Sequence, residues 1–167
     1  MNKTKKLTLL SVFTAIAMVL SYIEMLLPPI VASVPGIKIG LANIVIIFLI
    51  YKFSFKSAAA VSVIRVLLTS LLFGNAVIFL YSLCGAVLSL IFMGILKKTD
   101  SFSKISVSVV GGVSHNLGQI LVAIALMQNL KIGYYMAVLT VSGTLSGVVV
   151  GIISVYVLKH TEKLNLK

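Results

Sequence analysis

Six apolar stretches with short polar connections make up most of this 167-residue chain. A helix needs about 20 apolar residues to cross about 30 Å of hydrocarbon, and most of the stretches reach that length. Only 10% of the residues are charged, against about 25% in a typical soluble domain. The sequence therefore predicts an all-α integral membrane protein, a compact six-transmembrane-helix bundle that forms one domain over residues 1–167. The predicted spans are residues 7–27, 37–51, 54–73, 76–96, 105–127 and 134–158.

The lysines are distributed unevenly between the connections. Only Lys38 and Lys131 lie in the first, third or fifth connection, and the other lysines lie at the two termini or in the second and fourth connections. Lys and Arg are retained on the cytoplasmic side of membrane proteins, so both termini are predicted to be cytoplasmic. The net charge of +11 then reflects topology and contact with the lipid bilayer, and the sequence predicts no nucleic-acid partner. The lysines on the predicted cytoplasmic side are Lys3, Lys5, Lys6, Lys52, Lys56, Lys97, Lys98, Lys104, Lys159, Lys163 and Lys167.

Residues 28–38, PPIVASVPGIK, contain all three prolines of the chain and form the longest predicted connection. Proline restricts the backbone, and Pro35-Gly36 is a typical turn dipeptide. Two interpretations are open. The segment is either a plain helix connector or a lid over a site that opens to the outer face.

Several polar side chains lie inside the apolar stretches. An arginine at the centre of a bilayer costs about 3 kcal/mol on insertion scales, so Arg65 is expected to face the protein interior. His115 and Gln119 are four residues apart, and Asn116 and Gln119 three apart, so they are predicted to share one helix face. We expect a cavity between the midplane and the outer surface that suits an anionic or strongly hydrogen-bonding solute. The candidate binding residues are Glu24, Lys38, Asn43, Arg65, His115, Asn116 and Gln119.

Structural roles are open for the same residues. Arg65 could bond to backbone carbonyls of a neighbouring helix, and His115 could make an interhelical hydrogen bond. Glu24 could form an ion pair with Arg65 or Lys38. In each case the side chain would stabilise the bundle and contact no ligand.

Small residues predict where helices approach closely. Gly143, Gly147 and Gly151 recur every fourth residue in the last stretch, and packing within the chain is their expected use. In the first stretch, Ser11 and Ala15 lie on one stripe and Ala17 and Ser21 on a neighbouring one. These four residues are the candidate docking surface for a partner protein.

No catalytic constellation is visible in the sequence. Diphosphate chemistry uses clustered aspartates to hold Mg²⁺, and this chain has only Asp100. Cys84 is the only cysteine, and the chain lacks the phosphate-binding motif G-x-x-x-x-G-K-[ST]. The sequence therefore predicts no enzyme activity, no metal site and no cofactor.

Three segments carry a resemblance to a known family: PGIKIGLANIV (35–45), RVLLTSLLFG (65–74) and GGVSHNLGQILVA (111–123). They resemble the bacterial family described as heptaprenyl diphosphate synthase component I or Gx transporter, and the resemblance covers nearly the whole chain. That family is in turn similar to the substrate-binding S components of energy-coupling factor (ECF) vitamin transporters. The resemblance implies a six-helix protein in the bacterial plasma membrane, with an outer site roofed by the loop after the first helix. It also implies that small residues of the first helix dock a transmembrane coupling subunit, which works with cytoplasmic ATPases.

The resulting hypothesis is a membrane component that binds a small anionic or polar-aromatic solute and delivers it inward with partner subunits that hydrolyse ATP. The resemblance implies a vitamin or a precursor of isoprenoids, quinones or flavins as this solute. The alternative is a non-catalytic membrane partner of a polyprenyl diphosphate synthase or of a membrane redox complex. A proton-coupled transporter using Glu24 and His115 is a third possibility, but the sequence shows no internal inverted repeat.

Overall fold

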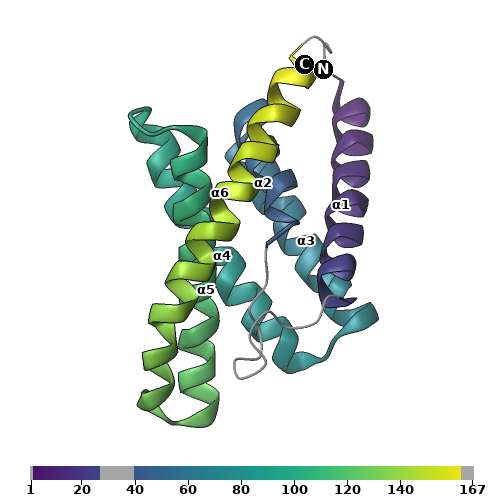
Figure 1. Ribbon diagram of the computed structural model, residues 1–167. Helices are drawn as coiled ribbons and strands as arrows, with labels where there is room; N and C mark the ends of the chain where they lie inside the picture. Colours follow the sequence, from purple (N-terminus) through teal and green to yellow (C-terminus); the bar gives the residue numbers. More distant parts are fainter. Residues whose placement is uncertain (1, 27–39, 163–167) are drawn as a thin grey trace.

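The computed structural model describes residues 2–26 and 40–162, which contain six α-helices, one 3-10 helix and no strand (Figure 1). All the α-helices except α2 are long and apolar enough to cross a membrane. The bounds of these five lie within about one helical turn of the predicted spans. The elements are α1 (Lys3–Leu26), α2 (Asn43–Lys52), α3 (Phe55–Phe73), α4 (Ala76–Thr99), α5 (Lys104–Met127), η1 (Leu130–Tyr135) and α6 (Met136–Thr161).

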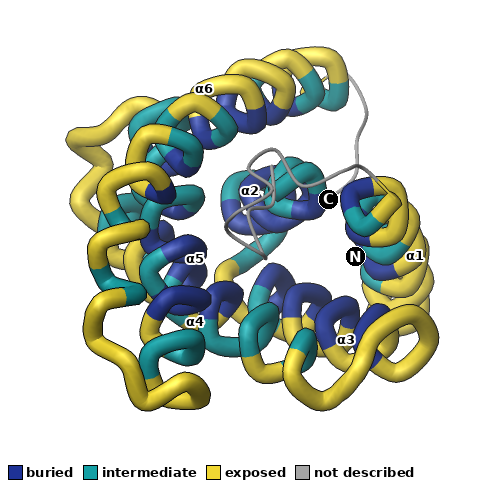
Figure 2. The backbone as a smooth tube through the Cα atoms, turned by 60° about the horizontal axis from the view of Figure 1, so that its bottom comes forward, coloured by how far each residue is buried: buried dark blue, intermediate teal, exposed yellow. Residues whose placement is uncertain are grey.

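Helix α2 differs most from the prediction for its part of the chain. It has 10 residues and so extends only about 15 Å, half the hydrocarbon thickness. Residues 45–50 are all buried, and six successive positions cover every face of a helix. Figure 2 accordingly shows α2 in the middle of a ring formed by the other helices. The second apolar stretch therefore supplies a short central helix in the described residues, because its all-round apolar surface is best buried inside the bundle.

Side-chain caps explain why α3, α4 and α5 begin where they do. Ser54 accepts a hydrogen bond from the Ser57 amide at 3.2 Å, and Asn75 accepts one from Ile78 at 2.9 Å. Ser103 accepts one from the Ser106 amide at 3.0 Å. Each cap satisfies an amide that the first turn of a helix leaves without a partner. The short connections that result reverse the direction of the chain from one helix to the next.

The described ends of the chain lie at the same end of the molecule, together with the α2–α3 and α4–α5 connections (Figure 1). Lys52 Nζ donates to the carbonyl of Thr161 at 3.1 Å, and Lys97 Nζ donates to the carbonyl of Ile50. Both lysines therefore satisfy carbonyls at the C-terminal ends of helices, where a positive charge is also favourable. This lysine-rich end collects the connections that the charge pattern assigned to one side of the membrane. That this side is cytoplasmic stays a prediction.

The topology can be tested with single cysteines in a Cys84→Ser background. Gln128 and Ser101 are both exposed and lie at opposite ends of α5. A cysteine at position 128 is expected to react with a membrane-impermeant maleimide added to intact cells, and one at position 101 only after the cells are opened. The reverse labelling pattern would show that the predicted orientation is wrong and that the lysine-rich end lies outside the cell.

The glycine stripe of α6 packs against α5, which confirms the expected packing within the chain. A Cβ atom added to Gly147 would lie 2.5 Å from the Cα of Val109, and one added to Gly151 would lie 3.0 Å from the Cα of Ile105. A Cβ atom added to Gly112 of α5 would likewise lie 2.6 Å from the carbonyl oxygen of Gly143. The two backbones therefore touch over several turns, at a separation that only glycine allows.

Candidate functional site

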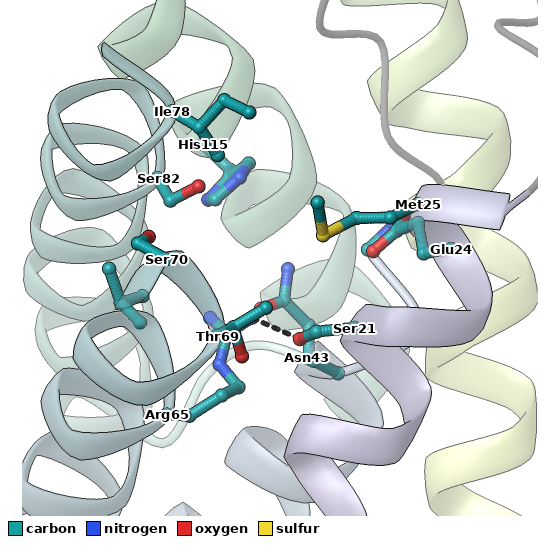
Figure 3. Close-up of a pocket in the computed structure, with 13 residues that line it drawn as sticks. Ser21, Glu24, Met25, Asn43, Arg65, Thr69, Ser70, Ile78, Ser82 and His115 are labelled. Atoms are coloured by element: carbon teal, nitrogen blue, oxygen red, sulfur yellow. Dashed lines mark hydrogen bonds between the residues drawn. The ribbon is translucent and has the colours of Figure 1, made fainter. Parts of the chain in front are cut away.

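A polar cavity lies in the half of the bundle away from the lysine-rich end, and Figure 3 shows the residues that line it. Its walls come from α1, α3, α4 and α5 and from the residues that open α2. Met25 and Ile78 add apolar surface. The polar residues that line it are Ser21, Glu24, Asn43, Arg65, Thr69, Ser70, Ser82 and His115.

Arg65 is the only arginine of the chain and is almost fully buried, with 8% of its surface exposed. Its Nη1 donates to Ser21 Oγ on α1 at 2.9 Å. Figure 3 shows this hydrogen bond as a dashed line. Its Nε has no hydrogen-bond partner among the described residues. A guanidinium has five N–H donors, and burying any of these donors without a hydrogen-bond partner is unfavourable. Arg65 therefore brings a positive charge to the wall of the cavity, with one buried donor that no described residue satisfies.

Glu24 is buried on the opposite wall, one turn after Ser21 on α1. Its Oε1 accepts a hydrogen bond from the amide of Gly40, just before α2. Gly40 has φ of 78°, a left-handed conformation that glycine adopts with little strain. Glu24 thus ties the end of α1 to the entry of α2, and its charge attracts that of Arg65.

Thr69 and Ser70 lie about one turn beyond Arg65 on α3 and line the same cavity. Both are buried, and Thr69 Oγ1 has no hydrogen-bond partner in the part of the chain that the structure describes. Neither residue was among the candidates predicted from the sequence. The four-residue spacing between Arg65 and Thr69 could have identified Thr69, because residues at i and i+4 share a helix face.

The polar residues that were predicted to share one face of α5 point in different directions in the structure. His115 lines the cavity, and its Nε2 lies 3.3 Å from Nε2 of Gln119. Asn116 Nδ2 instead donates to the carbonyl of Leu139 on α6, at 2.8 Å. The expectation that His115 and Asn116 share one face is therefore wrong, because adjacent helical residues point about 100° apart.

The predicted binding residues are thus only partly brought together. Glu24, Asn43, Arg65 and His115 line one cavity, whereas Gln119 reaches it only through His115. Lys38 lies outside the described residues, as does the segment interpreted as a lid. Ser21, which was assigned to partner docking, is a cavity residue and hydrogen-bonds to Arg65. Its three-residue spacing from Glu24 was the signal that could have placed it there.

The cavity is small in this conformation. It leaves about 20 Å³ for water-sized molecules, which is room for about one water. The described residues contain no cluster of three or more His, Cys, Asp or Glu that could hold a metal ion. The arrangement can place a positive charge, a hydroxyl and an imidazole around one small polar group.

Comparison with known proteins gives one match. The family model described as heptaprenyl diphosphate synthase component I matches residues 13–157, which is most of the chain. No curated protein and no solved structure matches the chain.

Proposed function

Because this chain belongs to the heptaprenyl diphosphate synthase component I family, we propose that it is a non-catalytic membrane subunit that works with partner proteins. In this proposal it captures a small anionic or strongly hydrogen-bonding solute in the cavity beside Arg65. Its action then corresponds to that of an S component of an ECF-type uptake transporter. The solute enters from the face opposite the lysine-rich end and leaves inward when ATP-hydrolysing partners engage.

The observation that supports solute capture is a pair of polar groups at the cavity with no partner in the part of the chain that the structure describes. Arg65 Nε and Thr69 Oγ1 are both buried without a hydrogen-bond partner among the described residues. Burying a polar group in this way costs about 1 to 3 kcal/mol. A carboxylate or phosphate oxygen accepts from both groups and neutralises the guanidinium. Such a ligand would therefore offset the unfavourable burial.

A solute larger than water needs the cavity to widen, and α1 is the wall best able to move. Helix α5 packs along its length against both α4 and α6. Helix α1 instead packs mainly against α3 and makes only a small contact with α2. The hydrogen bonds Ser21–Arg65 and Glu24–Gly40 join the cavity side of α1 to α3 and to the residues before α2. Outward movement of α1 would break these bonds and expose the donors of Arg65 to the solute.

A second candidate function is supported by the family description and by the size of the cavity. A non-catalytic partner of a polyprenyl diphosphate synthase needs no solute site, and room for about one water suits a purely structural polar cluster. In that case Arg65 and Ser21 would simply join α1 to α3.

Native mass spectrometry of the protein purified from its own membranes tests the proposal. A bound small molecule in the purified protein, together with co-purified ATPase subunits, would support solute capture. Recovery of a soluble prenyl-transferring enzyme, with neither a solute nor ATPases, would replace it with the second candidate.

The docking proposal can be tested with two alanines of α1. The structure divides the predicted docking surface, because Ala17 and Ser21 are buried within the chain whereas Ser11 and Ala15 are exposed. We expect Ala15→Leu to leave folding intact and to weaken recovery of the partner subunits by at least about tenfold, because a bulky side chain separates helices that need close contact.

Ala17→Leu is the matched comparison for Ala15→Leu. Ala17 has no exposed surface, so this variant is expected to lower the thermal stability of the purified subunit itself. If Ala15→Leu and the parent recover equal amounts of partner subunits, the exposed stripe of α1 is not a docking surface.

A further inference from the structure

A second hollow lies at the lysine-rich end, between the beginning of α3 and the end of α4. It has a volume of about 440 Å³ and is lined by Phe55, Ile91, Gly94, Ile95, Lys97 and Lys98. This volume is within the range of about 300 to 1,000 Å³ that is common for small-molecule sites. The hollow, called the α3–α4 groove below, shares no lining residue with the Arg65 cavity.

Gly94 shapes the floor of the α3–α4 groove. A Cβ atom at this position would lie 2.6 Å from the ring of Phe55, so the glycine allows that ring to rest against the backbone of α4. Ile91 and Ile95, one turn apart on α4, both have exposed side chains. Together these residues give the groove an apolar wall that faces the surrounding lipid.

Positive charge lies at one end of this apolar wall. Lys97 is held in place, because its Nζ donates to the carbonyl of Ile50 and lies 5.5 Å from the ring centre of Tyr51. Lys98 is exposed and makes no hydrogen bond or ion pair within the described residues. Lys56, next to Phe55 at the start of α3, is also exposed. Lys98 therefore offers an available ammonium at the end of the groove nearest the membrane surface.

We infer that the α3–α4 groove binds one anionic phospholipid. The order of residues along α4 matches the order of groups in such a lipid: Ile91 and Ile95 lie deeper in the membrane, and Lys98 lies at the headgroup level. An acyl chain then covers Phe55, Ile91 and Ile95, while the phosphate accepts a hydrogen bond from the ammonium of Lys98. Basic pockets between transmembrane helices are known to hold anionic headgroups, which is the chemistry that this groove offers. The inference does not depend on the proposed solute site.

The test compares two phospholipids that differ only in the headgroup. The full-length protein is delipidated in detergent and titrated with dioleoylphosphatidylglycerol or dioleoylphosphatidylcholine, and bound lipid is counted by native mass spectrometry. The parent protein is expected to bind phosphatidylglycerol more tightly. Lys98→Gln should weaken phosphatidylglycerol binding about fivefold, the effect expected for one lysine at a membrane surface, and leave phosphatidylcholine binding unchanged.

Each variant has a matched control elsewhere on the surface. Lys159→Gln removes an exposed lysine from the same end of the molecule and should leave phosphatidylglycerol binding unchanged. Ile95→Trp fills the groove and should weaken binding of both lipids, whereas Ile152→Trp on the exposed face of α6 should weaken neither.

Three results would overturn the inference. Equal losses for Lys98→Gln and Lys159→Gln would show that net charge, not the groove, attracts the lipid. Unchanged binding by Ile95→Trp would place the acyl chains elsewhere. Displacement of phosphatidylglycerol by geranylgeranyl diphosphate, but not by inorganic diphosphate, would assign the groove to an isoprenoid instead of a phospholipid.

Discussion

Replacing Arg65 with glutamine is expected to weaken solute binding by roughly 10- to 100-fold. The substitution removes a charge-assisted hydrogen bond to the solute, which contributes about 1.5 to 3 kcal/mol. Glutamine keeps hydrogen-bonding capacity and removes a charge from the membrane interior, so the variant should fold. The measurement is retention of the co-purifying solute in native mass spectra, with the melting temperature recorded for the same preparations.

Asn116→Ala is the matched control for Arg65→Gln. Asn116 is also a buried polar residue, but its side chain bonds to Leu139 of α6 and does not line the cavity. This variant should lose about 1 kcal/mol of stability and bind the solute as the parent does. Gln119→Ala should weaken binding less than Arg65→Gln, because Gln119 acts only through His115.

Unchanged solute retention by Arg65→Gln would contradict the proposed site. If that variant instead fails to insert into the membrane, Arg65 is a structural clamp between α1 and α3. The synthase-partner function would then be the better explanation of the same buried cluster.

Gly147→Ala is expected to destabilise the protein by about 1 to 3 kcal/mol, although alanine is the better helix former by about 1 kcal/mol. The added methyl would lie 2.5 Å from the Cα of Val109 and 3.1 Å from the carbonyl oxygen of Ser108. Both contacts are with backbone, so α5 and α6 must separate to admit it. Reversible unfolding of the purified protein by sodium dodecyl sulfate measures the loss.

Gly133→Ala makes the same chemical change at an open position. The nearest atom to its added methyl would be Cδ1 of Ile124, at 3.8 Å. This variant should therefore unfold at the same detergent concentration as the parent. If both variants unfold alike, close packing of the α6 glycine stripe on α5 does not limit stability.

The sequence by itself determined the class of protein and the ends of most helices. Apolar length and charge number are local properties, so they predict long membrane helices without knowledge of their neighbours. The capping side chains of Ser54, Asn75 and Ser103 act within one turn, and the predicted boundaries there agree closely with the observed ones. Arg65 was likewise expected in the interior, because a charge in lipid is unfavourable wherever its helix packs.

Only the tertiary structure decided which face of each helix meets which neighbour. Helix α2 is apolar on every side, so its composition could not distinguish a lipid-spanning helix from a buried one, and the ring of surrounding helices made it central. His115 and Asn116 are both polar neighbours in sequence, yet one lines the cavity and the other bonds to α6. Ala15 and Ala17 have the same side chain, yet one is exposed and the other buried. These outcomes depend on contacts between helices far apart in the chain, and spacing within one helix carries no information about its partners.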